Sequence, residues 1–319
     1  MQKSNSKSIG NSAIISCIGS GLIGGGWAAY FLAQGRDVVA WDPAPDGEDR
    51  LRKLIDDAWP HLSAMGLAPD AAKERLRYAS TLESAVKDVG FIQESAPEVL
   101  DVKQTLLAEI DAAAPTDTII ASSTSGFPVT LLQEKATYPE RIVAGHPFNP
   151  SYLIPLVEVA GGKQTSPEII DNTVAFYEGL GKTVIRLNRE VTGFVANRLQ
   201  EAIWREASHM VAADEATVEE IDAAIVNGPG LRWAIYGPCM TYHLAVRNGG
   251  MEVLLERLSD GRADAYTRAS MPDITDELKQ KLIEGCKSEQ GKRSTNDLII
   301  ERDQKLVTIL KALQENARR

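Results

Sequence analysis

The chain has 319 residues, of which 44% are hydrophobic, and this is enough for about two domains with a sizeable core. Its 34 basic and 44 acidic residues give a formal charge of −10 at pH 7, which disfavours nucleic acid and anionic membranes as partners. The three cysteines, Cys17, Cys239 and Cys286, are far apart and form no CxxC pair, so we predict a reduced cytoplasmic protein without a metal site. The first apolar run ends at Gly19, and this run is too short for a signal peptide or a membrane span.

The first part of the chain alternates short apolar or β-branched runs with longer helical patterns, which is typical of a parallel sheet covered by crossover helices. After Asn188 the apolar residues recur only at helical spacing, for example in residues 219–226 and 297–313. We therefore predict an α/β protein: a doubly wound, Rossmann-type parallel sheet domain at residues 1–189, followed by an all-helical domain at residues 190–319. The predicted strands are Ala13–Ile18, Asp37–Trp41, Gly90–Glu94, Thr118–Ser122, Arg141–Gly145, Pro155–Val159 and Thr183–Leu187.

A glycine-rich loop follows the first predicted strand and opens a helix that ends at Gly35. Its sequence is Gly19-Ser20-Gly21-Leu22-Ile23-Gly24, and this spacing provides a tight turn, a close approach to a pyrophosphate and close packing of helix on strand. Asp42 follows the second strand, where a carboxylate accepts hydrogen bonds from the ribose of NAD and repels the 2′-phosphate of NADP. The pattern predicts an NAD site; the alternative is that the glycines and Asp42 serve only as turn residues.

A histidine and a glutamate lie on consecutive predicted strands. His146 directly follows the strand Arg141–Gly145, and Glu158 lies inside the apolar run Pro155–Val159, where an ionised carboxylate needs a partner. A carboxylate on one imidazole nitrogen fixes the tautomer, so that the other nitrogen can take a proton from an alcohol. We predict that His146 and Glu158 form a general-base pair; alternatively, His146 satisfies a buried carbonyl and Glu158 faces solvent.

The chain resembles the L-3-hydroxyacyl-CoA dehydrogenases and their small-substrate relatives. The resemblance covers about residues 13–257 and rests on the glycine loop together with four motifs in the family's order: Ser122–Gly126 (SSTSG), Gly145–Pro150 (GHPFNP), Pro155–Val159 (PLVEV) and Gly193–Leu199 (GFVANRL). It implies His146 and Glu158 as the catalytic pair, an interdomain cleft and a homodimer formed through the helical domain.

The resemblance also implies further site residues. Ser125 and Asn197 would bind the substrate oxygen, and Glu98, Lys103 and Asn149 would line the cofactor site. From the residues alone, Ser125 is equally well explained as a turn residue, Asn197 as a helix-surface amide and Lys103 as a solvated helix charge. A further alternative is a structural or sensor protein that binds NAD without turnover, although such a protein needs no proton acceptor.

The branch of the family follows from charge and, by resemblance, from four further motifs: Trp41–Pro43 (WDP), Ala58–Pro60 (AWP), Gln93–Glu98 (QESAPE) and Gly230–Ala234 (GLRWA). Members that bind CoA thioesters need basic groups after the second strand, whereas residues 44–77 hold six basic against seven acidic residues. The resemblance is closest to the small-substrate branch and implies L-carnitine as the substrate; L-gulonate or a short-chain 3-hydroxyacyl-CoA is the alternative. A quaternary ammonium would be bound by aromatic faces. Trp233 and Tyr236 are three residues apart on a predicted helix and face one way, but such a pair is more often part of a helix core, so no binding cage is assigned.

Overall fold

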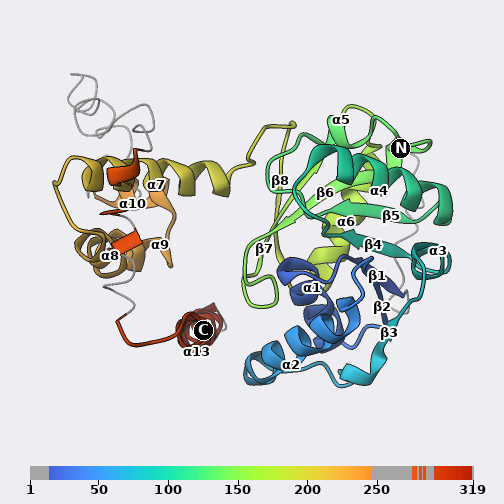
Figure 1. Ribbon diagram of the computed structural model, residues 1–319, viewed down its shortest axis with the longest axis horizontal. Helices are drawn as coiled ribbons and strands as arrows, with labels where there is room; N and C mark the ends of the chain where they lie inside the picture. Colours follow the sequence, from blue (N-terminus) through green and yellow to red (C-terminus); the bar gives the residue numbers. More distant parts are fainter. Residues whose placement is uncertain (1–13, 246–274, 279, 282, 285–290, 318–319) are drawn as a thin grey trace. The chain divides into compact units, whose positions relative to one another are not determined.

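The computed structural model describes residues 14–245, 275–278, 280–281, 283–284 and 291–317 (Figure 1). Ala13 and Cys286 lie outside the described residues. The chain divides into two compact units, Met1–Asn197 with Asp303–Thr308 and Arg198–Arg302 with Ile309–Arg319. The domain limits inferred from the sequence, residues 1–189 and 190–319, stay a proposal.

The first unit is built on one eight-stranded sheet with the order β3-β2-β1-β4-β5-β6-β7-β8. All neighbouring strands are parallel except β6 and β7, which are antiparallel. The strands are β1 (Ile15–Ile18), β2 (Val38–Trp41), β3 (Leu76–Tyr78), β4 (Phe91–Glu94), β5 (Ile119–Ser122), β6 (Ile142–Pro147), β7 (Leu156–Gly161) and β8 (Thr183–Arg186). The prediction of a doubly wound, Rossmann-type sheet is confirmed.

The structure corrects the sequence prediction at three points. The β6–β7 pair is antiparallel because residues 148–155 are too few for the crossover that a parallel pair requires. Strand β3 was not predicted, since its three residues include only one buried apolar side chain, Leu76. His146 lies inside β6 rather than after it, because pairing with β7 extends that strand to Pro147.

Helices cover both faces of the sheet, and the two resulting cores take alternate residues of each strand (Figure 1). On one face lie α1 (Leu22–Ala33) and α6 (Pro167–Gly179), packed on strand residues such as Cys17 and Phe91, and α2 (Gly47–Met65) packs against α1. On the other face lie α3 (Leu82–Val86), α4 (Leu100–Ala113) and α5 (Val129–Leu132), packed on residues such as Ile18 and Ile92. This double burial explains why the strands are continuous apolar runs. Two short 3₁₀ helices, η1 (Lys73–Arg75) and η2 (Pro139–Arg141), precede β3 and β6.

The described part of the chain after residue 195 is helical and contains no strand. It contains α7 (Ala196–Ala212), α8 (Val218–Asn227), α9 (Pro229–Trp233), α10 (Pro238–Leu244) and α13 (Thr295–Ala317), and the described residues 276–278, 280–281 and 283–284 are also helical. The expectation that Trp233 and Tyr236 share a helical face is wrong, because α9 ends at Trp233 and α10 begins only at Pro238. No helix within the described residues is long and apolar enough to span a membrane.

A buried lysine stabilises the connection between β6 and β7. The Lys182 Nζ donates to the carbonyl oxygens of Ser151 at 2.6 Å and Ile154 at 3.0 Å, and it lies 3.8 Å from the centre of the Tyr30 ring. Burial lowers the pKa of Lys182 to about 7. Because the ordinary value is 10.5, the unfolded chain binds more protons than the folded protein between about pH 7 and pH 10.5.

We therefore expect the free energy of unfolding to rise with pH across this window. The Lys182 contribution is on the order of a few kcal/mol over the whole interval. Urea unfolding measured from pH 6 to pH 10 checks this, and Lys182→Met is expected to flatten the profile. Lys87→Met, which removes an exposed lysine, is the matched control. A pH profile that Lys182→Met leaves unchanged contradicts the assignment.

Candidate functional site

Glycine is needed for a different structural reason at each of three positions in the loop between β1 and α1. Gly19 has φ +97°, and a Cβ there would lie 2.7 Å from the carbonyl oxygen of Ser95. A Cβ on Gly24 would lie 1.9 Å from the carbonyl oxygen of Gly19, so any larger residue would push the helix away from the strand. A Cβ on Gly21 meets no atom within 4 Å, and Gly21 is the N-cap of α1. The backbone therefore leaves open space at a helix N-terminus, where an anionic group can approach.

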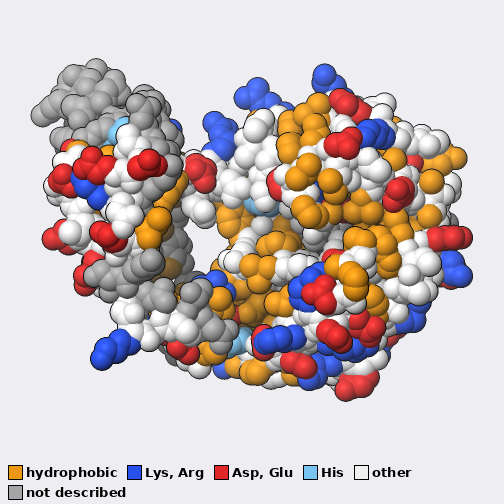
Figure 2. Space-filling view, viewed as in Figure 1, with side chains coloured by type: hydrophobic (Ala, Val, Ile, Leu, Met, Phe, Trp, Pro, Cys, Tyr) orange, Lys and Arg blue, Asp and Glu red, His pale blue; other side chains and the backbone are white. Residues whose placement is uncertain are grey.

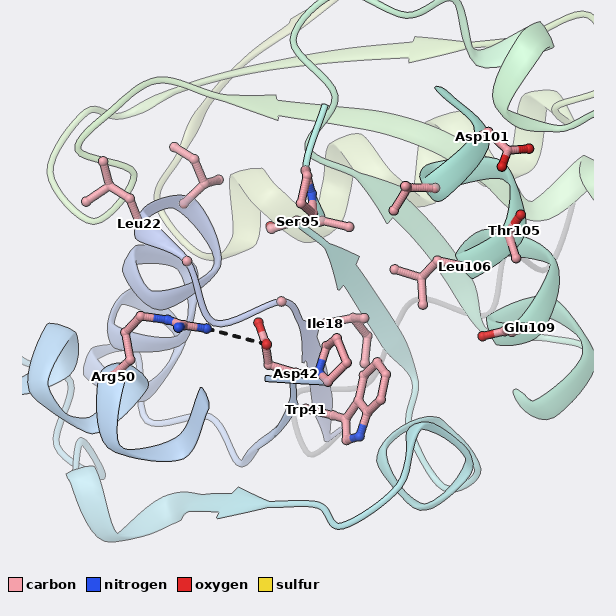
Figure 3. A pocket seen from close by; sticks show the side chains of 17 residues that line it. Ile18, Leu22, Trp41, Asp42, Arg50, Ser95, Asp101, Thr105, Leu106 and Glu109 are labelled. Carbon is pink, nitrogen blue, oxygen red and sulfur yellow. Dashed lines mark ion pairs between the residues drawn. The ribbon is translucent and has the colours of Figure 1, made fainter. Parts of the chain in front are cut away.

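This open side of the loop faces a cavity of about 770 Å³ (Figure 3). Of the predicted cofactor residues, Gly19, Gly21, Leu22, Ile23 and Asp42 line it. Figure 3 shows Trp41 and Asp42 at the end of β2 on one side and Leu106, Thr105 and Glu109 on α4 on another. The loop, the helix N-terminus and the carboxylate thus meet in one cavity, and this arrangement fits a dinucleotide.

The Asp42 carboxylate is held by two backbone donors. Its Oδ2 accepts from the Ser20 N–H at 2.8 Å, and its Oδ1 accepts from the Ala44 N–H at 2.9 Å. Burial would raise the pKa of Asp42, but these hydrogen bonds and the nearby Arg50 guanidinium outweigh it and the pKa is lowered. The group is therefore a fixed anion in the cavity, as the ribose-binding role requires.

The structure brings His146 and Glu158 together across the antiparallel β6–β7 pair, in which they are directly opposite. The His146 Nδ1 lies 2.9 Å from Glu158 Oε2, and both side chains are buried. Glu158 Oε1 accepts from the N–H groups of Val195 at 2.9 Å and Ala196 at 3.0 Å, at the start of α7. Burial would raise the pKa of Glu158, but the hydrogen bonds from His146 and from these amides lower it. An ionised Glu158 fixes the Nδ1–H tautomer and leaves Nε2 as the acceptor.

Two aromatic rings fix the plane of the His146 imidazole. Phe194 stacks on it at 5.0 Å between centroids with an interplanar angle of 13°, and Phe148 contacts it edge-on at 5.1 Å. Phe194 is buried and has φ +50°, an uncommon conformation for a bulky residue. Sequence reasoning did not assign Phe194 a role, although it lies in the GFVANRL motif directly before the amides that bind Glu158.

Ser125 and Asn197 also lie together. The Asn197 side-chain amide donates to the Ser125 carbonyl oxygen at 3.0 Å. Glu98 binds the same loop. Its Oε1 accepts hydrogen bonds from the N–H groups of Ser125 at 2.9 Å and Gly126 at 3.0 Å and from the Thr124 hydroxyl at 2.6 Å. The backbone of the serine loop is therefore fixed from both sides. Binding of a substrate oxygen by Ser125 and Asn197 stays a prediction.

Lys103 is placed differently from a solvated helix charge. It is buried and bonds to Glu94 Oε1 at 3.0 Å, and its Nζ lies 3.6 Å from Glu98 Oε2. The residues that line the cavity do not include Glu98, Lys103 or Asn149. Asn149 is exposed on the loop after β6. In this structure Lys103 forms an ion pair with Glu98, and Glu98 accepts hydrogen bonds from the backbone of the serine loop. Their contact with the cofactor stays a prediction.

A buried polar network behind His146 was not found from the sequence. The Gln93 amide donates to the Ser123 hydroxyl at 2.8 Å and to the Gly145 carbonyl at 3.3 Å, and its oxygen accepts from the Tyr177 hydroxyl at 2.5 Å. Through these bonds Gln93 of β4 connects the end of β5 and the middle of β6, next to His146, to α6. Its members are separated by up to 84 positions, so no local pattern reveals it. Within the described residues, no group of three His, Cys, Asp or Glu side chains is placed to hold a metal ion.

Comparison with known proteins assigns both parts of the chain to one family. Residues 14–191 match the model of the 3-hydroxyacyl-CoA dehydrogenase NAD-binding domain, and residues 193–288 match that of its C-terminal domain. The chain belongs to the 3-hydroxyacyl-CoA dehydrogenase family. Membership confirms the predicted family, the α/β domain followed by a helical domain, and NAD as the cofactor. The chain is an NAD-dependent dehydrogenase that acts on a CH–OH group.

Several members of this family are similar to the chain over almost its whole length. L-carnitine dehydrogenase of Streptomyces griseus subsp. griseus is 54% identical over 93% of this chain and 89% of its own length. L-carnitine dehydrogenase of Pseudomonas putida is 47% identical over 94% of this chain and 93% of its own length. Among solved structures, an NAD⁺-dependent dismutase, 5-formyl-3-hydroxy-2-methylpyridine 4-carboxylic acid 5-dehydrogenase, is 32% identical with a TM-score of 0.84, covering 95% of this chain and 99% of that chain.

Proposed function

We propose that the protein oxidises the 3-hydroxyl of L-carnitine to 3-dehydrocarnitine with NAD. The observation that carries the chemistry is the buried His146–Glu158 pair with its nitrogen-to-oxygen distance of 2.9 Å. The substrate is supported by eight relatives, 44% to 54% identical over 93% to 95% of this chain, each named L-carnitine dehydrogenase.

The proposed proton transfer follows from the tautomer that Glu158 fixes. The His146 Nδ1–H donates to Glu158, so Nε2 takes the proton of the 3-hydroxyl. Glu158 stabilises the resulting imidazolium, while the amides of Val195 and Ala196 keep its carboxylate ionised. NAD, when bound, supplies the hydride acceptor for C3 of the substrate. Ser125 and Asn197 are proposed to hold the substrate oxygen as it becomes a carbonyl.

The charges of α2 favour a small substrate over a CoA thioester. Figure 2 shows blue and red side chains intermixed over this part of the surface. Arg52 is paired with Glu48 at 2.7 Å, Lys53 with Asp57 at 2.7 Å and Lys73 with Asp56 at 2.5 Å. Because each of these basic groups has a carboxylate beside it, the positive and negative charges largely cancel, and this stretch provides little attraction for the phosphates of CoA.

A substrate panel tests the proposal: L-carnitine, D-carnitine, L-gulonate, 3-hydroxybutyrate and 3-hydroxybutyryl-CoA, each with NAD⁺, with NADH absorbance as the readout. L-carnitine is expected to give the highest kcat/KM. If L-gulonate or the CoA thioester gives a higher kcat/KM than L-carnitine, that compound and not L-carnitine is the substrate. NAD⁺ binding without turnover of any member would favour the alternative of a non-catalytic NAD-binding protein.

We also propose a cytoplasmic homodimer. In the second unit, large apolar side chains are exposed on or beside α8–α10, including Val226 at 64%, Leu231 at 64% and Ile235 at 65%. Exposed apolar surface of this kind supports a second copy of the chain as the partner. The homodimer is expected to have twice the chain mass of 34.6 kDa by light scattering, and Ile235→Asp is expected to weaken it. A monomer at micromolar concentration contradicts the proposal.

A further inference from the structure

We propose that Gln93 is a positioning residue for the reaction, because it sets the separation between the strand of His146 and the loop of Ser125. Tyr177 fixes the direction in which the Gln93 amide points. The inference rests on the proposed function, in which His146 and Ser125 meet the same substrate oxygen. It adds two buried side chains that act on this site through the groups they bind.

Gln93 joins two strands at the point where their backbone pairing ends. Strands β5 and β6 are parallel, and the last residues in register are Ser122 and Ala144. The next residue of each segment is bound by the Gln93 side chain, whose Nε2 donates to the Ser123 hydroxyl at 2.8 Å and to the Gly145 carbonyl at 3.3 Å. One amide of β4 therefore holds both segments just beyond the end of their ladder.

These two segments carry the groups that the proposed reaction brings to one oxygen. Gly145 directly precedes His146, and Ser123 is two residues before Ser125. A general base and a hydrogen-bond donor must both lie within hydrogen-bond reach of that oxygen, so a shift of about 1 Å between the segments can lower the rate about a hundredfold. The amide that spans the two segments therefore sets a distance on which the rate depends.

The direction of the Gln93 amide follows from its partners. The Gly145 carbonyl can only accept, so Nε2 faces it and Oε1 faces the Tyr177 hydroxyl, which donates at 2.5 Å. Burial raises the pKa of Tyr177, so the phenol stays protonated and remains a donor. Both N–H groups of the amide and its oxygen thus have partners, and a buried amide bonded in this way holds one orientation.

Tyr177 is itself held in one place by its neighbours. Its buried ring stacks on Trp27 at 5.4 Å between centroids and contacts Phe91 edge-on at 5.6 Å. A Cβ on Gly145 would lie 2.1 Å from the Tyr177 hydroxyl oxygen. The glycine before the catalytic histidine therefore leaves the space through which this hydroxyl reaches the amide.

An amide at this position does little for the stability of the sheet. Strand β4 is buried at every residue, and the net contribution of neutral hydrogen bonds in such a place is modest. Replacing all partners by apolar groups of the same shape can be nearly neutral for stability. An apolar side chain cannot, however, fix the distance between Ser123 and Gly145. Turnover and stability are therefore expected to respond differently when Gln93 is replaced.

The test compares Gln93→Met with Thr118→Val. Methionine keeps the length of the side chain and removes the hydrogen bonds to Ser123, Gly145 and Tyr177, so kcat with L-carnitine is expected to fall about 10- to 100-fold. Thr118→Val is the matched control, since the Thr118 hydroxyl donates a buried hydrogen bond at 2.7 Å at the amino end of β5, away from Ser123. It is expected to lower the melting temperature without lowering kcat.

Tyr177→Phe is a milder variant and serves if Gln93→Met does not fold. It keeps the packed ring and removes one hydroxyl, and kcat is expected to fall about fivefold, which corresponds to one neutral hydrogen bond. Combining Gln93→Met with Tyr177→Phe leaves no unpaired phenol in the core. The double variant is therefore expected to regain part of the melting temperature that Gln93→Met loses, but not its kcat.

A second comparison uses the His146→Ala background. If Gln93 acts through His146, Gln93→Met is expected to lower the residual rate of His146→Ala by less than about threefold, because residues that act as a unit are not additive. A purely structural role would lower the rate by the same factor in both backgrounds, since it would reduce the fraction of folded enzyme.

The outcomes separate the positioning role from the proposed function. A large loss of kcat in Gln93→Met that disappears in the His146→Ala background, with a normal kcat in Thr118→Val, supports the inference. An unchanged kcat in Gln93→Met, an equal loss in both backgrounds, or a return of kcat in the double variant overturns it and leaves the proposed function standing. A normal kcat in His146→Ala contradicts the proposed base, and the role of Gln93 fails with it.

Discussion

Replacing His146 by alanine is expected to lower kcat by about two to four powers of ten, the usual contribution of general-base catalysis. The physical reason is the loss of the acceptor nitrogen that the 2.9 Å contact with Glu158 holds in one tautomer. NAD⁺ affinity is expected to change little, because His146 is not among the residues that line the cavity of the glycine loop. Steady-state rates with L-carnitine and calorimetric titration with NAD⁺ measure the two quantities separately.

Glu158→Gln is the companion variant. A glutamine keeps the shape of the side chain and a hydrogen bond to the imidazole, but it removes the charge that stabilises the imidazolium. The loss in kcat is therefore expected to be smaller than for His146→Ala. A near-normal rate of NADH formation in His146→Ala would show that another group takes the proton, and the proposed mechanism would be wrong.

The parts of the site that the sequence revealed depend on short-range patterns. The roles of Gly19 and Gly24 follow from backbone conformation and from contacts within a loop of six residues, so their spacing alone is informative. The pairing of His146 with Glu158 was accessible because a carboxylate inside an apolar strand needs a partner and the preceding strand offered one. Its geometry was not accessible, because the antiparallel register of β6 and β7 was not foreseen.

The parts that the sequence did not reveal depend on contacts between distant segments. In the sequence Arg50 is one of several charged residues on a predicted helix. Only the folded structure shows that α2 places it beside Ser20 and Asp42. Glu94 gave no signal of its buried ion pair with Lys103, because both lie in ordinary strand and helix patterns. A period of two or 3.6 residues says which face of an element is buried, but it does not say which polar groups meet there.

Removing the positive charge of the trimethylammonium group of carnitine is expected to lower kcat/KM strongly. This cation cannot donate a hydrogen bond, so a pocket that selects it must use aromatic faces and diffuse negative charge. Each such contact contributes about 0.5 to 2 kcal/mol in a partly desolvated site. Two or three contacts correspond to one to several powers of ten in kcat/KM, as an order of magnitude. Removing the positive charge of the substrate is therefore expected to lower kcat/KM more than reducing the size of the group.

The decisive comparison is between L-carnitine and 3-hydroxy-5,5-dimethylhexanoate, the neutral carbon isostere with the same shape and the same reacting hydroxyl. Carnitine is expected to be oxidised best, with the isostere lower by one to several powers of ten in kcat/KM. L-gulonate is expected to be poor as well, because its hydroxyls require hydrogen-bonding partners that a site built for an ammonium group does not supply. Equal rates for carnitine and its isostere would show that the positive charge is not recognised. Such a result would place the protein in another substrate branch of the family, while the roles proposed for His146 and Glu158 would be unaffected.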